Sequence, residues 1–180
     1  MVLVVGLLAL FVRVIFALIS PHVDPFISEN PLHGDAASYD RIARSLLAGT
    51  GFSQFPPEPD VFWPPLYPIS LWLTYSIFGY ELIIARLVQA VLGAATCVMI
   101  YLLGEQLFER RIALLAGLGA VFYPYHILFG NWLIAESLFM LLLVVAVYLL
   151  AQLARKPSIP LCLASGVVIG LGILAKPTLL

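Results

Sequence analysis

Charged side chains are scarce in this 180-residue chain: they make up 11% of it, whereas hydrophobic residues make up 62%. A soluble domain is about one quarter charged and about half apolar, and a fold of this size leaves much of its surface in water. This composition therefore excludes a soluble enzyme and a disordered chain. Nine basic residues against ten acidic ones also provide no positive field for the phosphates of a nucleic acid. The composition indicates a protein that crosses a membrane several times.

Cysteine and the common catalytic motifs are also nearly or wholly lacking. The two cysteines, Cys97 and Cys162, lie inside apolar runs, where a thiol behaves as a small hydrophobic side chain. Their number and spacing exclude a disulfide framework and a CxxC metal pair. No Walker loop, GxGxxG or GxSxG motif occurs, which removes the usual sequence evidence for nucleotide binding or for a serine hydrolase.

Long uncharged runs predict helices that cross a membrane, which takes about 20 apolar residues. Residues 1–20 lack the basic start and the small-x-small site of a signal peptide, so we interpret them as a retained span. Four further runs approach the required length: residues 87–104, 112–135, 137–154 and 159–175. Pro124, beside Tyr123 and Tyr125, marks the end of one span and a short interfacial turn. The predicted fold is an all-α polytopic bundle of about five spans.

Residues 21–80 differ from the rest of the chain, because they hold nine of the thirteen prolines and six acids against two arginines. They predict a long hydrophilic loop after the first span. Within it, residues 36–48 have the pattern of an amphipathic helix on the bilayer surface, with Tyr39 and Ile42 on its apolar face. Asp40 and Arg44 are spaced to pair across one helical turn.

Residues 61–80 carry no charge and are long enough to be a further span, but three prolines break their first half. The basic connectors at residues 109–111 and 155–156 are separated by two spans, so they lie on the same side of the membrane. Their positive charge indicates that this is the inner side, because basic connectors are enriched there. We favour a surface or re-entrant segment at 61–80, because the acidic loop then lies outside. If the segment crossed, the loop would lie inside.

Charge at a membrane edge is costly, so each such residue is a candidate for function. Asp35 precedes the amphipathic helix and is either its N-cap or a base for a hydroxyl acceptor. Glu136, near the outer end of a span, is either an interfacial carboxylate bonded to Asn131 or Arg86, or a second acid in the same cavity as Asp35. The preferred topology puts both acids on the outer side.

Three basic residues lie in or at the ends of spans. Arg86 and Lys176 are near outer ends, where they either anchor a helix at the interface or bind a lipid-linked phosphate. Arg13 lies more than halfway along the first span, and we expect it to pair with a carboxylate. The three histidines lack the spacing of a metal site, and His33 with Asp35 offers only two ligands.

Several segments, in order, resemble one family of membrane enzymes. Residues 34–39 (GDAASY), 43–49 (ARSLLAG) and 51–53 (GFS) resemble the first outer loop of polytopic C-type glycosyltransferases. The branch is that of the dolichyl-phosphate-mannose protein mannosyltransferases and the lipid A aminoarabinose transferase. Residues 63–68 (WPPLYP), 85–87 (ARL), 136–138 (ESL) and 170–177 (GLGILAKP) are also similar to that branch.

The resemblance implies an enzyme of the cell membrane that transfers a sugar from a polyprenyl-phosphate donor to a lipid, glycan or protein acceptor on the extracytoplasmic face. It also implies one membrane-embedded domain over residues 1–180, with residues 21–80 as its first extracytoplasmic loop. Family members have more spans than five, and residues 176–180 form no polar tail. We therefore expect this sequence to be the N-terminal part of a longer protein.

The resemblance assigns catalytic roles to Asp35 and Glu136. Substrate-binding roles fall to Arg86, Lys176, Tyr39 and His33. Ala36 stands where the family commonly has a second adjacent acid, so the resemblance supports no particular metal site and leaves a divalent metal open as a cofactor.

A transporter or a non-catalytic membrane subunit is the alternative. Transport predicts polar residues at mid-membrane and an internal repeat, whereas the charges here gather toward one face.

Overall fold

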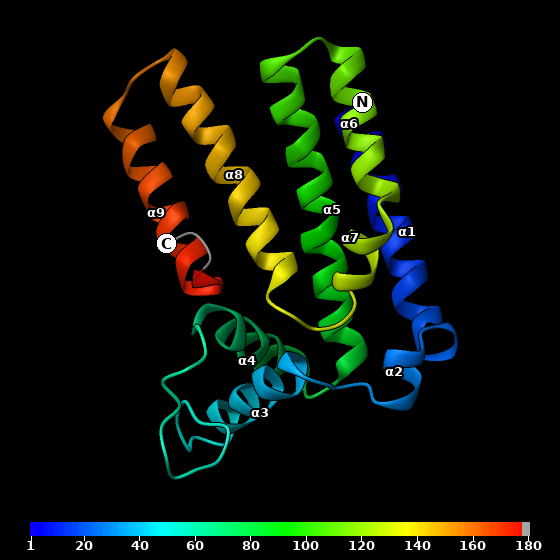
Figure 1. Ribbon diagram of the computed structural model, residues 1–180, viewed down its shortest axis with the longest axis vertical. Helices are drawn as coiled ribbons and strands as arrows, with labels where there is room; N and C mark the ends of the chain where they lie inside the picture. Colours follow the sequence, from blue (N-terminus) through cyan, green and yellow to red (C-terminus); the bar gives the residue numbers. More distant parts are fainter. Residues whose placement is uncertain (178–180) are drawn as a thin grey trace.

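The computed structural model describes residues 1–177, and every regular element within them is a helix (Figure 1). The helices are α1 (Val2–Val23), α2 (Pro25–Glu29), α3 (Asp35–Leu47), α4 (Leu66–Phe78), α5 (Leu82–Leu107), α6 (Arg110–Phe122), α7 (Pro124–Phe129), α8 (Glu136–Arg155) and α9 (Ile159–Ala175). The last residues of the sequence, 178–180, lie outside the described part.

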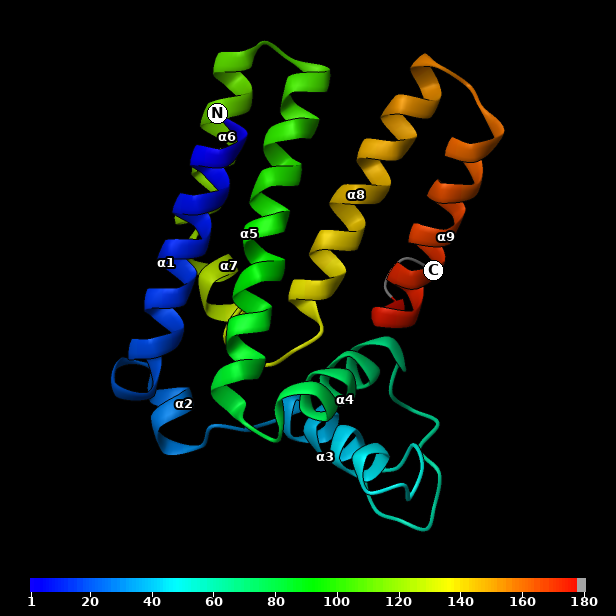
Figure 2. The ribbon, with the colours of Figure 1, turned by 180° about the vertical axis from the view of Figure 1, so that it is seen from behind.

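A bundle of roughly parallel and antiparallel helices forms most of the molecule. Helices α1, α5 and α8 are long and apolar enough to cross a membrane. The shorter α6 and α9, with 13 and 17 residues, run beside them: α6 packs on α5 and α1, and α9 packs on α8 (Figures 1 and 2). The predicted all-α membrane bundle is confirmed. Of the five expected spans, three are full-length helices and two are shorter.

The two ends of the bundle carry different parts of the chain. The α5–α6 and α8–α9 connectors lie at one end, whereas α2, α3 and α4 lie at the other, which we call the loop end (Figures 1 and 2). Helix α4 packs on α3 and also contacts α5 and α9. Residues 61–80 therefore stay at the loop end, as the surface interpretation predicted, and the two basic connectors share the opposite end.

The amphipathic helix forms almost where the sequence predicted it, as α3. Its residues Tyr39 and Ala43 belong to a core that includes Tyr67 and Tyr75 of α4, and Ile42 is also buried. The apolar side of α3 is therefore covered by another helix rather than by lipid alone.

The predicted pair of charges on α3 is present. Arg44 Nε donates to Asp40 Oδ2 over 2.8 Å. Asp40 is fully buried and also accepts hydrogen bonds from the hydroxyls of Tyr75 (2.9 Å) and Tyr80 (3.4 Å). A buried carboxylate needs such donors, and these join α3 to α4 and to the residues just before α5.

Topology can be tested by labelling two exposed positions at opposite ends. We expect Thr50→Cys to react with an impermeant thiol reagent in intact cells, and Pro157→Cys to react only after the membrane is opened. Buried Cys97 and exposed Cys162 are replaced by alanine beforehand, and the parent without cysteine is the control. Labelling of Pro157→Cys alone in intact cells would mean that the loop end faces inward.

The burial of one side of α3 predicts different effects of the same substitution on its two sides. Ile42→Asp puts a carboxylate where the side chain is 0% exposed, and should lower the free energy of unfolding by at least about 2 kcal/mol. Leu47→Asp, at a position 43% exposed, is the control and should change little. Thermal unfolding in detergent measures both, and equal stability of the two variants would contradict this packing.

Candidate active site at the loop end of the bundle

Asp35 begins α3 but does not cap it. The N-cap is Gly34, whose φ of 53° suits glycine. The carboxylate of Asp35 is exposed, and no residue within 1–177 donates a hydrogen bond to it. The N-cap interpretation is therefore wrong, and the carboxylate is free to meet a ligand at the loop end.

Tyr39 lies one turn further along α3 and is only 5% exposed. Its ring packs edge-on against the rings of Trp63 and Tyr67, with both centroid distances 4.9 Å. Burial, and then the negative charges of Asp35 and Glu136, raise the pKa of Tyr39 to about 12. The phenol is therefore protonated at neutral pH. Ala36 and Tyr39 of α3 share a hydrophobic core with Ala135, the residue before α8, so the first turns of the two helices, which carry the two predicted acids, lie at the same core.

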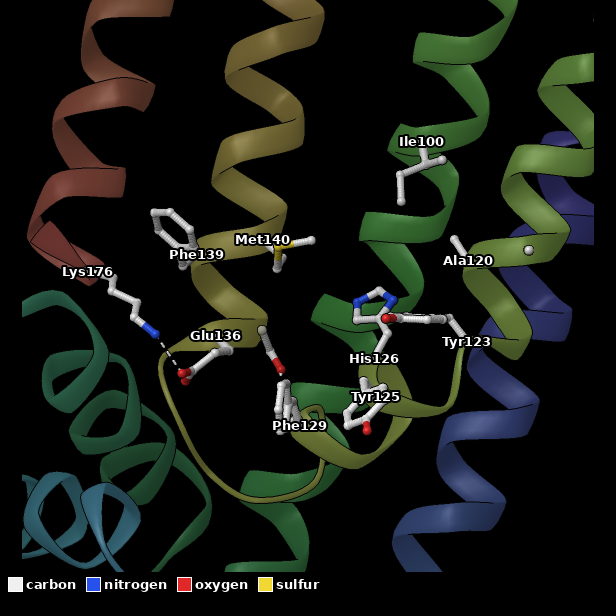
Figure 3. A pocket seen from close by; sticks show the side chains of 12 residues that line it. Ile100, Ala120, Tyr123, Tyr125, His126, Phe129, Glu136, Phe139, Met140 and Lys176 are labelled. Atoms are coloured by element: carbon white, nitrogen blue, oxygen red, sulfur yellow. Dashed lines mark hydrogen bonds and ion pairs between the residues drawn. The ribbon is translucent and has the colours of Figure 1, made fainter. Parts of the chain in front are cut away.

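Glu136 is the first residue of α8, and it pairs with Lys176 at the end of α9. The distance from Lys176 Nζ to Glu136 Oε1 is 2.7 Å (Figure 3). The side chain of Lys176 is 35% exposed and that of Glu136 is 29% exposed, so water reaches both. The expected partners of Glu136, Asn131 and Arg86, make no such contact: within residues 1–177 the lysine occupies that role.

This ion pair lies at the edge of an apolar cavity of about 800 Å³. The walls come from α5, from α6 and α7, and from α8, with Ile100, Ala120 and Met140 among the lining side chains (Figure 3). Cavities of this size hold ligands of several hundred daltons. The combination of an apolar interior and a charged edge suits an amphiphile whose head remains near the loop end.

One wall of the cavity exists because the helix after α5 is broken. Helix α6 ends at Phe122, and Pro124 starts α7 in a new direction, since proline cannot donate a helical hydrogen bond. Arg13, 3% exposed, donates to the freed carbonyls of Ala120 (3.2 Å) and Val121 (3.4 Å). The expectation that Arg13 pairs with a carboxylate is therefore wrong: its guanidinium partners backbone oxygens.

The other predicted binding residues lie away from the cavity. Arg86 is 4% exposed on α5, and its Nε and one terminal nitrogen have no hydrogen-bond partner in the described part of the chain. The ring of His33 packs against Phe26 and Trp132, at centroid distances of 5.4 and 5.9 Å. Neither Arg86 nor His33 lines the cavity, and Asp35 and Tyr39 of α3 do not line it either, whereas Glu136 and Lys176 do.

The structure also bears on the metal that the sequence left open. Among residues 1–177, no three His, Cys, Asp or Glu side chains gather closely enough to hold an ion. Asp35 therefore has no two further ligands of these types beside it in the described part of the chain.

His126 is a cavity residue to which sequence reasoning gave no role. It lines the cavity from α7, and its Nδ1 lies 3.0 Å from a terminal nitrogen of Arg13. The sequence did contain one indication of this role: a histidine two residues after a proline, inside an otherwise apolar run. A proline interrupts the helix, and irregular backbone within an apolar bundle is tolerated where it lines a cavity.

Comparison with known proteins agrees with the resemblance. A family model described as dolichyl-phosphate-mannose-protein mannosyltransferase matches residues 63–180. The match includes Glu136, His126 and Lys176 and begins after Asp35 and Tyr39. No curated protein and no solved structure matches the chain.

Reversing the charges of the Glu136–Lys176 pair tests this geometry. Glu136→Lys and Lys176→Glu each place like charges together and should each lower stability by roughly 1 kcal/mol, a small effect because water screens the pair. The double variant restores the attraction and should recover most of the loss. Thermal unfolding of the parent, the two single variants and the double variant gives the coupling free energy between the two side chains. If the losses of the single variants simply add in the double variant, the two side chains do not meet.

Proposed function

The chain belongs to the dolichyl-phosphate-mannose-protein mannosyltransferase family, and from this membership and the geometry of the site we propose that it transfers a sugar from a polyprenyl-phosphate donor to an acceptor hydroxyl. The family is one of membrane glycosyltransferases. The extracytoplasmic location of the reaction, at the loop end, is part of the proposal.

The main observation in support of the proposal is that charged side chains lie at one end of an apolar cavity. The cavity suits the isoprenoid chain of a lipid-linked donor, which is too apolar to leave the membrane. Lys176 and Glu136 line it at the loop end, and the residues next to Asp35 and Glu136, Ala36 and Ala135, belong to one hydrophobic core. A donor bound with its chain in the cavity has its phosphate and sugar among these groups.

Lys176 is the group best suited to the donor phosphate. An ammonium near the phosphate offsets the negative charge that grows on the leaving oxygen as the sugar departs. Its present partner is Glu136, so the phosphate competes with this carboxylate for the lysine. Arg86, the other candidate, is enclosed within the protein, which favours the lysine.

Asp35 is the group best suited to activate the acceptor. As the acceptor oxygen bonds to the anomeric carbon, the bond from that carbon to the phosphate oxygen breaks. The hydroxyl proton passes to the Asp35 carboxylate, and the polyprenyl phosphate leaves with the bonding electrons. Tyr39, protonated and adjacent, offers a hydrogen-bond donor to the substrates, and Glu136 shapes the opposite side of the site.

The test is Asp35→Asn in the full-length protein. Asparagine keeps the size of the side chain but cannot accept the proton, so transfer from a polyprenyl-phosphate sugar should fall by about 10²–10⁴-fold. Folding should be unchanged, because the carboxylate is exposed and is not the cap of α3. The measurement is the initial rate with purified enzyme in detergent or vesicles.

Glu29→Gln is the matched control, since it removes an exposed acid of the same loop that lies outside the site. It should transfer sugar at the parent rate. If folded Asp35→Asn transfers sugar at a near-parental rate, Asp35 is not the base.

A further inference from the structure

The contact between Arg13 and His126 fixes where the imidazole proton resides. Arg13 donates, because a guanidinium has only N–H groups and keeps its charge in proteins. The Nδ1 atom of His126, 3.0 Å from the guanidinium, is therefore the acceptor. In the neutral ring the proton then lies on Nε2.

That second nitrogen has no partner within the described residues. His126 Nε2 is buried, and neither a side chain nor a carbonyl in residues 1–177 accepts its hydrogen bond. The ring itself lines the cavity (Figure 3). A buried N–H without an acceptor costs free energy, whereas one that meets a charged acceptor contributes more than an ordinary hydrogen bond.

We propose that His126 is a binding residue for the lipid-linked donor and that its Nε2–H donates to a phosphate oxygen. Arg13 is the positioning residue that sets the tautomer and the direction of the ring. The inference rests on the proposed function, because it takes the cavity ligand to be a polyprenyl phosphate. It adds a neutral donor to the ammonium of Lys176, on the opposite wall of the same cavity.

The phosphate is the part of such a ligand that fits this donor. An isoprenoid chain has no hydrogen-bond acceptor, and the cavity walls around Ile100 and Met140 are apolar. The sugar has to reach Asp35 and the acceptor at the loop end. The phosphate lies between these two parts of the donor, and it alone carries charged acceptor oxygens for the Nε2–H of His126.

Equilibrium binding of farnesyl phosphate to the purified full-length protein tests the inference, with farnesol as the probe that lacks phosphate. We expect His126→Leu to weaken farnesyl phosphate binding by roughly 10- to 100-fold, the range for a hydrogen bond to a charged group. Farnesol binding should be nearly unchanged. His126→Gln keeps an amide N–H near the position of Nε2 and should bind farnesyl phosphate within a few-fold of the parent.

Two further variants keep the result interpretable. His22→Leu removes an exposed histidine of α1 outside the cavity and should bind both probes as the parent does. His126→Asn, whose shorter amide reaches the Nδ1 position only, replaces His126→Leu if the leucine variant does not fold. Retained farnesol binding shows that a variant is folded.

The outcomes separate the two claims. Parental affinity of folded His126→Leu or His126→Asn for farnesyl phosphate would overturn the role of His126 and leave the proposed function standing. Failure of the parent itself to bind farnesyl phosphate would overturn the donor class, and the role of His126 with it.

The positioning role of Arg13 has its own readout. In protein labelled with ¹⁵N-histidine, the His126 signal, identified by its loss in His126→Asn, should report a proton on Nε2. Arg13→Leu should give a mixture of tautomers and weaken farnesyl phosphate binding. An unchanged His126 signal in Arg13→Leu would show that the arginine only supports the fold.

Discussion

The need to satisfy backbone carbonyls where a helix breaks within an apolar bundle shapes this protein more than any other constraint. Water cannot solvate such groups in the hydrocarbon, so a break persists only where the protein supplies partners. Arg13 of α1 supplies them to the end of α6. Gly93 of α5 leaves room for it, because a Cβ there would lie 2.6 Å from the arginine Nε. Three helices thus meet around one guanidinium.

The break also determines how the site is assembled. Because α7 turns away from the axis of α6, a space opens between α5, α7 and α8 that the spans would otherwise fill. The chain then returns to the loop end, where α8 begins at Glu136 and α9 brings Lys176 back beside it. Charges gather at the end that water reaches, where they cost little, and the apolar space extends from them into the bundle. Helices α3 and α4, joined through the buried Asp40, hold Asp35 and Tyr39 at the same end of the bundle, where Tyr39 shares a core with Ala135.

Local patterns were enough to predict the elements of the fold. Apolar runs predicted the spans, periodicity predicted α3 and its Asp40–Arg44 pair, and prolines predicted that residues 61–80 do not cross. Contacts between distant segments were not predictable in this way. Arg13 meets Ala120, 107 residues away, and Glu136 meets Lys176 rather than its expected neighbours. Such partners depend on how α1 and α9 are placed in the bundle, which no local pattern encodes. Likewise, the sequence left a cap or a base as roles for Asp35, whereas α3 starts one residue earlier than predicted, so that Gly34 is the cap and the carboxylate is free.

The most direct measurement is an experimental structure of the full-length protein with a bound polyprenyl phosphate. The cavity should hold the isoprenoid chain between Ile100 and Met140, and the phosphate should lie within hydrogen-bond distance of Lys176, with the Glu136 ion pair opened. A chain bound on another face of the bundle, or a phosphate far from Lys176 with the ion pair intact, would contradict this site.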